Sequence, residues 1–122
     1  MPAVWYHVRD LDAGRRFYTE KLGFEVTHLD VEERWARLEQ RGMEVGLVEG
    51  EPQDGGVASV EVDDVKAEAA RLREEGVEIG VVFELHGEMR LLDVFDPDGN
   101  RIQLAEDLTR AGSGPSGASA AR

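Results

Sequence analysis

Cysteine is missing from the 122-residue chain, and so are long apolar runs. Without cysteine there is no disulfide framework, no thiolate metal site and no cysteine nucleophile. No stretch approaches the roughly 20 apolar residues that a membrane-spanning helix needs. No basic segment followed by an apolar stretch marks a signal peptide at the N-terminus. We therefore expect a cytoplasmic protein with no membrane partner.

Basic side chains are also scarce, because 14 Lys and Arg stand against 26 Asp and Glu, giving a formal net charge of −12. An excess of negative charge repels the phosphate backbone of nucleic acids and tolerates a cationic partner. The composition thus argues against nucleic acid as a partner, and it carries no information about the fold.

The C-terminal residues 109–122 lack large apolar side chains and are rich in Gly, Ser and Ala. Such a segment cannot bury enough surface to offset the entropy lost on ordering. We predict a flexible low-complexity tail there, following a single domain of residues 1–108. A weaker break, rich in Glu, Gly and Pro, covers residues 49–56. It divides the domain into two predicted modules, residues 1–50 and 55–107.

The two modules repeat each other in order, with one residue lost near the end of the predicted helix. The matching segments are residues 8–13 (VRDLDA) and 62–67 (VDDVKA), residues 23–26 (GFEV) and 76–79 (GVEI), and residues 45–49 (VGLVE) and 102–106 (IQLAE). Agreement at the start, middle and end of both modules indicates internal duplication, which sets the architecture before any single element does.

Each module opens with a short alternating segment. In the second module Ala58, Val60 and Val62 are apolar, whereas Ser59 and Glu61 between them are polar. Alternation with a period of two is typical of a half-buried strand. Since the offset between the modules is even at this point, the same faces are expected in the first module. Its helix-facing residues are then Val4, Tyr6 and Val8, and its opposite face carries Ala3, Trp5 and His7.

A helix and three more strands follow in each module. Asp10 and Asp64 are good N-caps, and Gly23 and Gly76 suit the left-handed position after a helix. The expected strands are residues 24–30, 34–39 and 44–49 in the first module, and 78–85, 89–95 and 101–106 in the second. Residues 96–100 (DPDGN) form a tight turn between the last two. The predicted fold class is therefore α+β, with the order βαβββ occurring twice.

Two stretches resemble the vicinal oxygen chelate superfamily, which contains glyoxalase I, bleomycin resistance proteins and extradiol dioxygenases. They are residues 7–26, including HVRDL, RFY and KLGFEV, and residues 89–104, including MR and DPDGNRIQL. The resemblance covers about residues 3–106. It implies tandem βαβββ modules that form a curled mixed sheet around a cavity, with the helices on the convex side. In relatives a second subunit usually completes this cavity, so a homodimer is expected.

The resemblance also locates the metal ligands of metal-using relatives, two early in the first strands of the modules and two in the last strands. The corresponding residues here are Ala3, Gly46, Val57 and Gln103. A divalent ion needs imidazole or carboxylate donors, which these four positions do not supply. We therefore expect no metal and no other cofactor. This prediction disfavours an enzyme without excluding one.

Several polar and aromatic side chains are expected on the cavity face. Trp5 and Trp35, with Arg37, suit stacking and cation–π contact with a ligand, although indoles can equally fill a dimer interface. His7 and Glu61 occupy equivalent places in the two modules and could bind a cation or act as an acid–base pair. A charge at Asp93, within an apolar strand, indicates a pocket position or a solvated edge. His28 and His86 are expected to be solvated.

These patterns lead to one functional prediction, a metal-free small-molecule-binding protein of the bleomycin resistance type with no catalytic residues. The ligand would be an aromatic or cationic natural product. The predicted ligand-binding residues are Trp5, His7, Trp35, Arg37, Gly46, Ser59, Glu61, Asp93 and Gln103. The alternative is a metal-dependent lyase, isomerase or dioxygenase of the same superfamily that uses a displaced metal site. A third possibility is a structural dimer with a collapsed cavity.

Overall fold

The computed structural model describes residues 4–53 and 56–109. Ala3 and residues 110–122 of the predicted tail lie outside the described residues. The elements of the first module are β1 (Val4–Val8), α1 (Leu11–Arg16), the π-helical turn η1 (Phe17–Lys21), β2 (Glu25–Asp30), β3 (Trp35–Gln40) and β4 (Met43–Glu49). Those of the second are β5 (Ala58–Glu61), α2 (Val65–Glu74), β6 (Glu78–Ile79), β7 (Phe83–Leu85), β8 (Met89–Phe95) and β9 (Arg101–Asp107).

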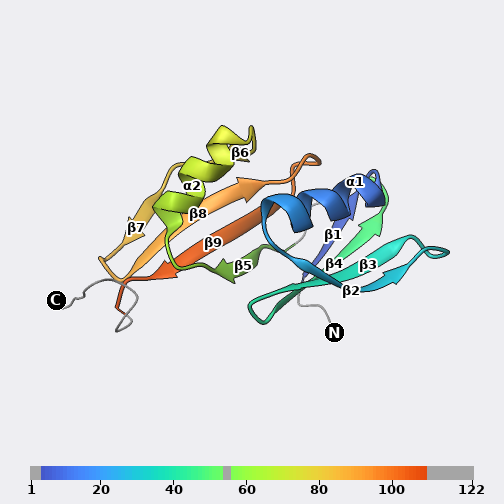
Figure 1. Cartoon of the computed structure of the whole chain (residues 1–122), viewed down its shortest axis with the longest axis horizontal. Coiled ribbons are helices and arrows are strands. Elements are labelled where there is room, and N and C mark those ends of the chain that lie inside the picture. Colours follow the sequence, from blue (N-terminus) through green and yellow to red (C-terminus); the bar gives the residue numbers. More distant parts are fainter. Residues whose placement is uncertain (1–3, 54–55, 110–122) are drawn as a thin grey trace.

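The strands form two mixed sheets, one for each module. Their orders are β1-β4-β3-β2 and β5-β9-β8-β6, with β7 also paired to β8. Figure 1 shows the two sheets side by side with α1 and α2 covering the same side of the molecule. The predicted α+β class is confirmed, and the strands of the first half follow the predicted βαβββ order.

One predicted strand is wrong in its extent. Residues 78–85 form the short strands β6 and β7 instead of one continuous strand. The Gly80 amide still donates to the Asp93 carbonyl, but Val81 is exposed and Val82 packs against the core. The interruption shifts the alternation by one residue, so that Phe83 faces the side opposite the core.

The strand register reproduces the duplication seen in the sequence. The first and last strands of each module are parallel neighbours, with Val4 opposite Val45 in the first sheet and Ala58 opposite Ile102 in the second. These pairs are equivalent under the repeat alignment. The duplication therefore extends to the pairing of individual residues.

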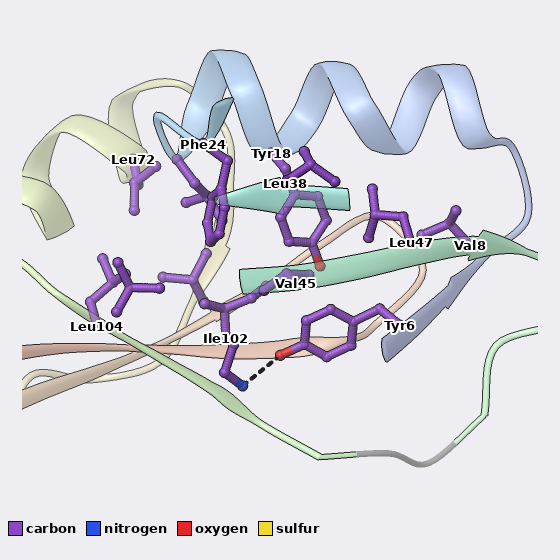
Figure 2. Packing of buried hydrophobic residues seen from close by; sticks show 14 of the residues in the cluster. Tyr6, Val8, Tyr18, Phe24, Leu38, Val45, Leu47, Leu72, Ile102 and Leu104 are labelled. Carbon is purple, nitrogen blue, oxygen red and sulfur yellow. Dashed lines mark hydrogen bonds between the residues drawn. The ribbon is translucent and has the colours of Figure 1, made fainter. Parts of the chain in front are cut away.

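A single apolar core lies between the sheets and the helices. Alternate strand residues enter it, and both helices contribute the buried stripe that their apolar spacing predicts. Figure 2 shows side chains of both modules in this core, including Leu38 and Leu47 of the first and Leu72 and Ile102 of the second. Each helix packs on the strands of its own sheet, and the core continues from one module into the other.

Two buried tyrosines connect the modules. The Tyr6 hydroxyl accepts a hydrogen bond from the Ala58 amide at 2.8 Å and donates to the Arg101 carbonyl. The Tyr18 hydroxyl donates to the carboxylate of Asp96 at 2.8 Å. Burial raises the pKa of both phenols, that of Tyr18 well above its usual value with a further contribution from Asp96. Both tyrosines therefore stay neutral donors over the ordinary pH range.

In each module a glutamate of the last strand accepts a hydrogen bond from the first amide of the helix. The Glu49 carboxylate accepts hydrogen bonds from the Leu11 amide at 3.0 Å and from the Nε and Nη2 atoms of Arg34 at 3.1 and 2.9 Å. These bonds, from Arg34 first and the Leu11 amide second, lower the pKa of Glu49 to about 2.

The second module repeats this arrangement. Glu106, itself buried, accepts the Val65 amide at 3.0 Å and a guanidinium nitrogen of Arg90 at 3.4 Å. Asp10 and Asp64 cap the two helices as predicted, each accepting an amide hydrogen bond from the first turn. Each helix N-terminus is thus held by two carboxylates, a favourable arrangement at the positive end of a helix.

Candidate functional site

The candidate site is the face of each sheet turned away from the helices, which we call the open face. In the first sheet one row across the strands contains Trp5, Gly46, Arg37 and His28 as successive neighbours. The equivalent row of the second sheet contains Ser59, Gln103 and Asp93. Neighbouring residues across a ladder point to the same face. The register thus places seven residues in two matching rows.

Trp5 lies flat over Gly46. A Cβ atom built on Gly46 would come within 2.4 to 2.6 Å of three atoms of the Trp5 indole, closer than any side chain allows. The absence of a side chain at this position therefore makes room for the ring. Trp5 is 40 % exposed even so, which leaves much of the ring available for contact.

Trp35 extends this aromatic surface. Its ring centroid lies 5.6 Å from that of Trp5, with an angle of 58° between the planes, and 4.8 Å from the ring of His28, with an angle of 36°. These separations are typical of favourable aromatic pairs. We call Trp5, Trp35 and His28 the aromatic cluster.

Arg37 lies beside the aromatic cluster, two residues along β3 from Trp35 and opposite both Gly46 and His28. It is partly buried. Within residues 4–53 and 56–109, no carboxylate and no carbonyl accepts a hydrogen bond from its guanidinium group. The first sheet thus combines an aromatic surface with the adjacent guanidinium group of Arg37, which makes no ion pair with a described residue.

The second open face differs in character. The Asp93 carboxylate pairs with Arg101 at 3.2 Å, so its charge is already compensated. Beyond this row lie Phe83 and Leu85 of β7, opposite Leu91 and Met89 of β8. Phe83 is 53 % exposed and Leu85 40 %. This face therefore combines the polar groups of Ser59 and Gln103 with exposed apolar side chains.

His7 and Glu61 lie in different environments. His7 is partly buried on the open face, where the Val48–Trp35 row continues across the first sheet. Glu61 lines a polar cavity of about 340 Å³ between the modules, together with Arg41 and Asp63 among others. His7 is not among the residues that line this cavity. The structure thus gives no support to an acid–base pair made of these two residues.

The residues at the ligand positions of metal-using relatives do not fit a metal ion. Gly46 and Val57 carry no donor atom, and Gln103 supplies a single amide. Ala3 lies outside the described residues. In the part of the chain that the structure describes, no group of three or more His, Asp or Glu side chains could hold a metal. No chemical step through a metal is therefore derived for this site.

Comparison with known proteins supports the predicted superfamily and fold. Residues 3–104 match the model of the Glyoxalase/Bleomycin resistance protein/Dioxygenase superfamily. No curated protein sequence matches the chain. Among solved structures, a glyoxalase/bleomycin resistance protein from Streptomyces sp. CB03234 is 30 % identical with a TM-score of 0.66, covering 82 % of this chain and 94 % of that one. The chain belongs to this superfamily.

Two other solved structures illustrate its range. TnmS3, an antibiotic binding protein from Streptomyces sp. CB03234, is 27 % identical with a TM-score of 0.66, over 84 % of this chain and 93 % of that one. Lactoylglutathione lyase from Agrobacterium tumefaciens is 18 % identical with a TM-score of 0.68, over 84 % and 89 %. The latter likeness concerns the fold alone. Binding proteins and enzymes thus share this architecture.

His28 is the member of the aromatic cluster that sequence reasoning missed. Counting by twos from Val26, which packs against the core, would turn His28 toward the core as well. The register of β2 and β3 shifts between these residues, and His28 therefore reaches the open face opposite Arg37. A β-bulge of this kind leaves little trace in the pattern of apolar residues.

Proposed function

We propose that this protein binds a small planar molecule on its open face without a metal and without catalysing a reaction. The observation that carries the proposal is the aromatic cluster, in which the rings of Trp5 and Trp35 lie 5.6 Å apart and Trp5 lies over Gly46, a residue with no side chain. Two indoles provide a large apolar surface for stacking at a low cost in conformational entropy. A metal-dependent reaction would require donor atoms that Gly46 and Val57 do not have.

A second copy of the chain completes the site in this proposal. The aromatic cluster is open to solvent on one side, and the equivalent face of the second sheet exposes Phe83 and Leu85. In a homodimer the open face of one module would cover that of another, enclosing a ligand between an aromatic wall and an apolar one. TnmS3, an antibiotic binding protein of the same fold, supports a natural product as the ligand.

Intrinsic fluorescence offers a direct test. The chain contains only two tryptophans, and both belong to the aromatic cluster. Titration with a panel of aromatic antibiotics should quench this fluorescence in a saturable way for at least one member, and calorimetry should give the same affinity. Trp35→Leu should weaken that binding about fivefold or more, since one stacked ring contributes roughly 1–3 kcal/mol.

Two controls make the test specific. Phe17→Leu removes an aromatic ring from η1, on the helix side of the sheet, and should leave binding unchanged. Elemental analysis of protein purified without chelator separates binding from metal-dependent catalysis. Near-stoichiometric zinc, nickel, manganese or iron would favour the enzyme, and a panel without any binder would contradict the proposal.

A further inference from the structure

We propose that the ligand carries an anionic group, a carboxylate or an ionised phenol, and that Arg37 binds it. This inference rests on the proposed function and adds to it the charge of the ligand. The overall acidity of the chain had favoured a cationic ligand. The open face of the first sheet favours the opposite charge at the position next to the indoles.

The Arg37 side chain differs from those of the other strand arginines in having no ion-pair partner among the described residues. Within the described residues, Arg90 pairs with Glu84 and Glu106, and Arg101 pairs with Asp93. Arg37 makes no ion pair with any described residue, although it is partly buried. A guanidinium group offers five N–H donors in a planar fork that suits a carboxylate. These donors are free to receive a ligand.

The neighbouring acidic residues do not compensate Arg37. The next row of the first sheet carries Glu25, Glu39 and Glu44. The Glu39 carboxylate accepts a hydrogen bond from the Gly42 amide in the turn after β3. Glu44 has an interaction of its own. Among the described residues, no ion pair joins Arg37 to Glu25 or Glu39, so these two carboxylates do not occupy its guanidinium group.

The spacing suits a planar acid. Trp35 and Arg37 are two residues apart on β3, which corresponds to roughly 7 Å along a strand. Trp5 lies across Gly46, the residue directly opposite Arg37. A bicyclic aromatic ring that stacks on the indoles can therefore place a carboxylate on its edge at the guanidinium group. A cationic substituent in the same place would meet Arg37 and be repelled.

Three probes of one shape distinguish the charges, namely naphthoate, naphthamide and naphthylmethylammonium. Calorimetric titration of the full-length protein should rank naphthoate first, about tenfold tighter than the amide, since hydrogen bonds to charged groups contribute roughly 1.5–3 kcal/mol. Arg37→Gln should weaken naphthoate binding more than naphthamide binding and thereby remove this tenfold preference.

Arg16→Gln is the matched control, because it removes the same charge from an exposed position on α1 and should preserve the preference. Equal affinity for naphthoate and naphthamide, or a preference that survives Arg37→Gln, would overturn the inference while leaving the binding function intact. Tightest binding of the ammonium probe would also overturn it. Failure of all three probes to bind would count against the proposed function itself.

Discussion

Removing the Tyr6 hydroxyl tests how the two modules are held together. In Tyr6→Phe the ring keeps its place in the core, and only one oxygen atom is lost. The Ala58 amide, which is wholly buried, then loses its acceptor. The Arg101 carbonyl belongs to an exposed residue and can bond to water instead. The cost is therefore that of one buried unsatisfied donor, about 1–3 kcal/mol.

Urea denaturation measures this cost. With a slope of about 1.5 kcal/mol/M, a loss of about 2 kcal/mol lowers the unfolding midpoint by about 1.3 M. Thr27→Val is the matched control, because its hydroxyl donates to the Arg37 carbonyl at an exposed position. That substitution should change stability by less than about 0.5 kcal/mol. If Tyr6→Phe cost no more than Thr27→Val, the buried bridge would not be what joins the modules.

The same hydroxyl makes a prediction about alkaline pH. Burial raises the pKa of Tyr6 in the folded protein, so folding favours the protonated phenol. The resulting stability is fully present below the unfolded value of 10.0 and is lost as the pH rises above it toward the folded pKa. Tyr6→Phe should therefore reduce the loss of stability at high pH, which a series of urea midpoints can follow.

Three further substitutions have definite expected results. The lowered pKa of Glu49 contributes stability above 4.5 that disappears as the pH falls toward about 2, so Glu49→Gln should flatten the acid limb of the stability profile, measured by urea midpoints across pH. Gly46→Ala places a methyl group inside the Trp5 ring, and the indole should move, shifting the fluorescence maximum without unfolding the protein. Tyr18→Phe leaves the buried Asp96 carboxylate short of one donor and should cost about 1–3 kcal/mol by thermal or urea denaturation.

The architecture could be predicted because the duplication constrains it twice. The alternation in residues 57–62 assigned the faces of the first strand of both modules, and the register of Val4 with Val45 and of Ala58 with Ile102 follows the same alignment. Gly23 and Gly76 have the positive φ expected after a helix, 78° and 81°. Local chemistry and the repeat point to the same answer at these positions, which makes the prediction dependable.

The interruptions of the strands were not predictable from apolar spacing. The strand that follows the helix is irregular in both modules. In the first module the register of β2 shifts between Val26 and His28, and in the second module the predicted strand is interrupted after Gly80 and forms β6 and β7. At these places tertiary packing decides which residue is left out of the ladder, and the choice changes the face of everything that follows. The exposure of His28 matches the prediction, but its place beside Trp35 and the outward direction of Phe83 could not be predicted from the sequence.

Ion pairs of long side chains were equally hidden. The alignment of residues 45–49 with 102–106 already matched Glu49 with Glu106, but nothing local indicated that each carboxylate reaches the start of a helix about 40 residues earlier in the chain. The pairing of Asp93 with Arg101 likewise depends on the register of β8 and β9. The ligand-binding role of the open-face residues stays a prediction.

The hydrogen bonds that Glu49 and Glu106 accept from the helix N-termini have a consequence for assembly. The hydrogen bond between Glu49 and the Leu11 amide lies wholly within the first module, and the one between Glu106 and the Val65 amide lies wholly within the second. Two chains could therefore exchange equivalent modules, and each module would keep its own hydrogen bond from the glutamate to the helix N-terminus. The shared core and links such as that between Tyr6 and Ala58 would then have to form between different molecules, with the same atoms on each side.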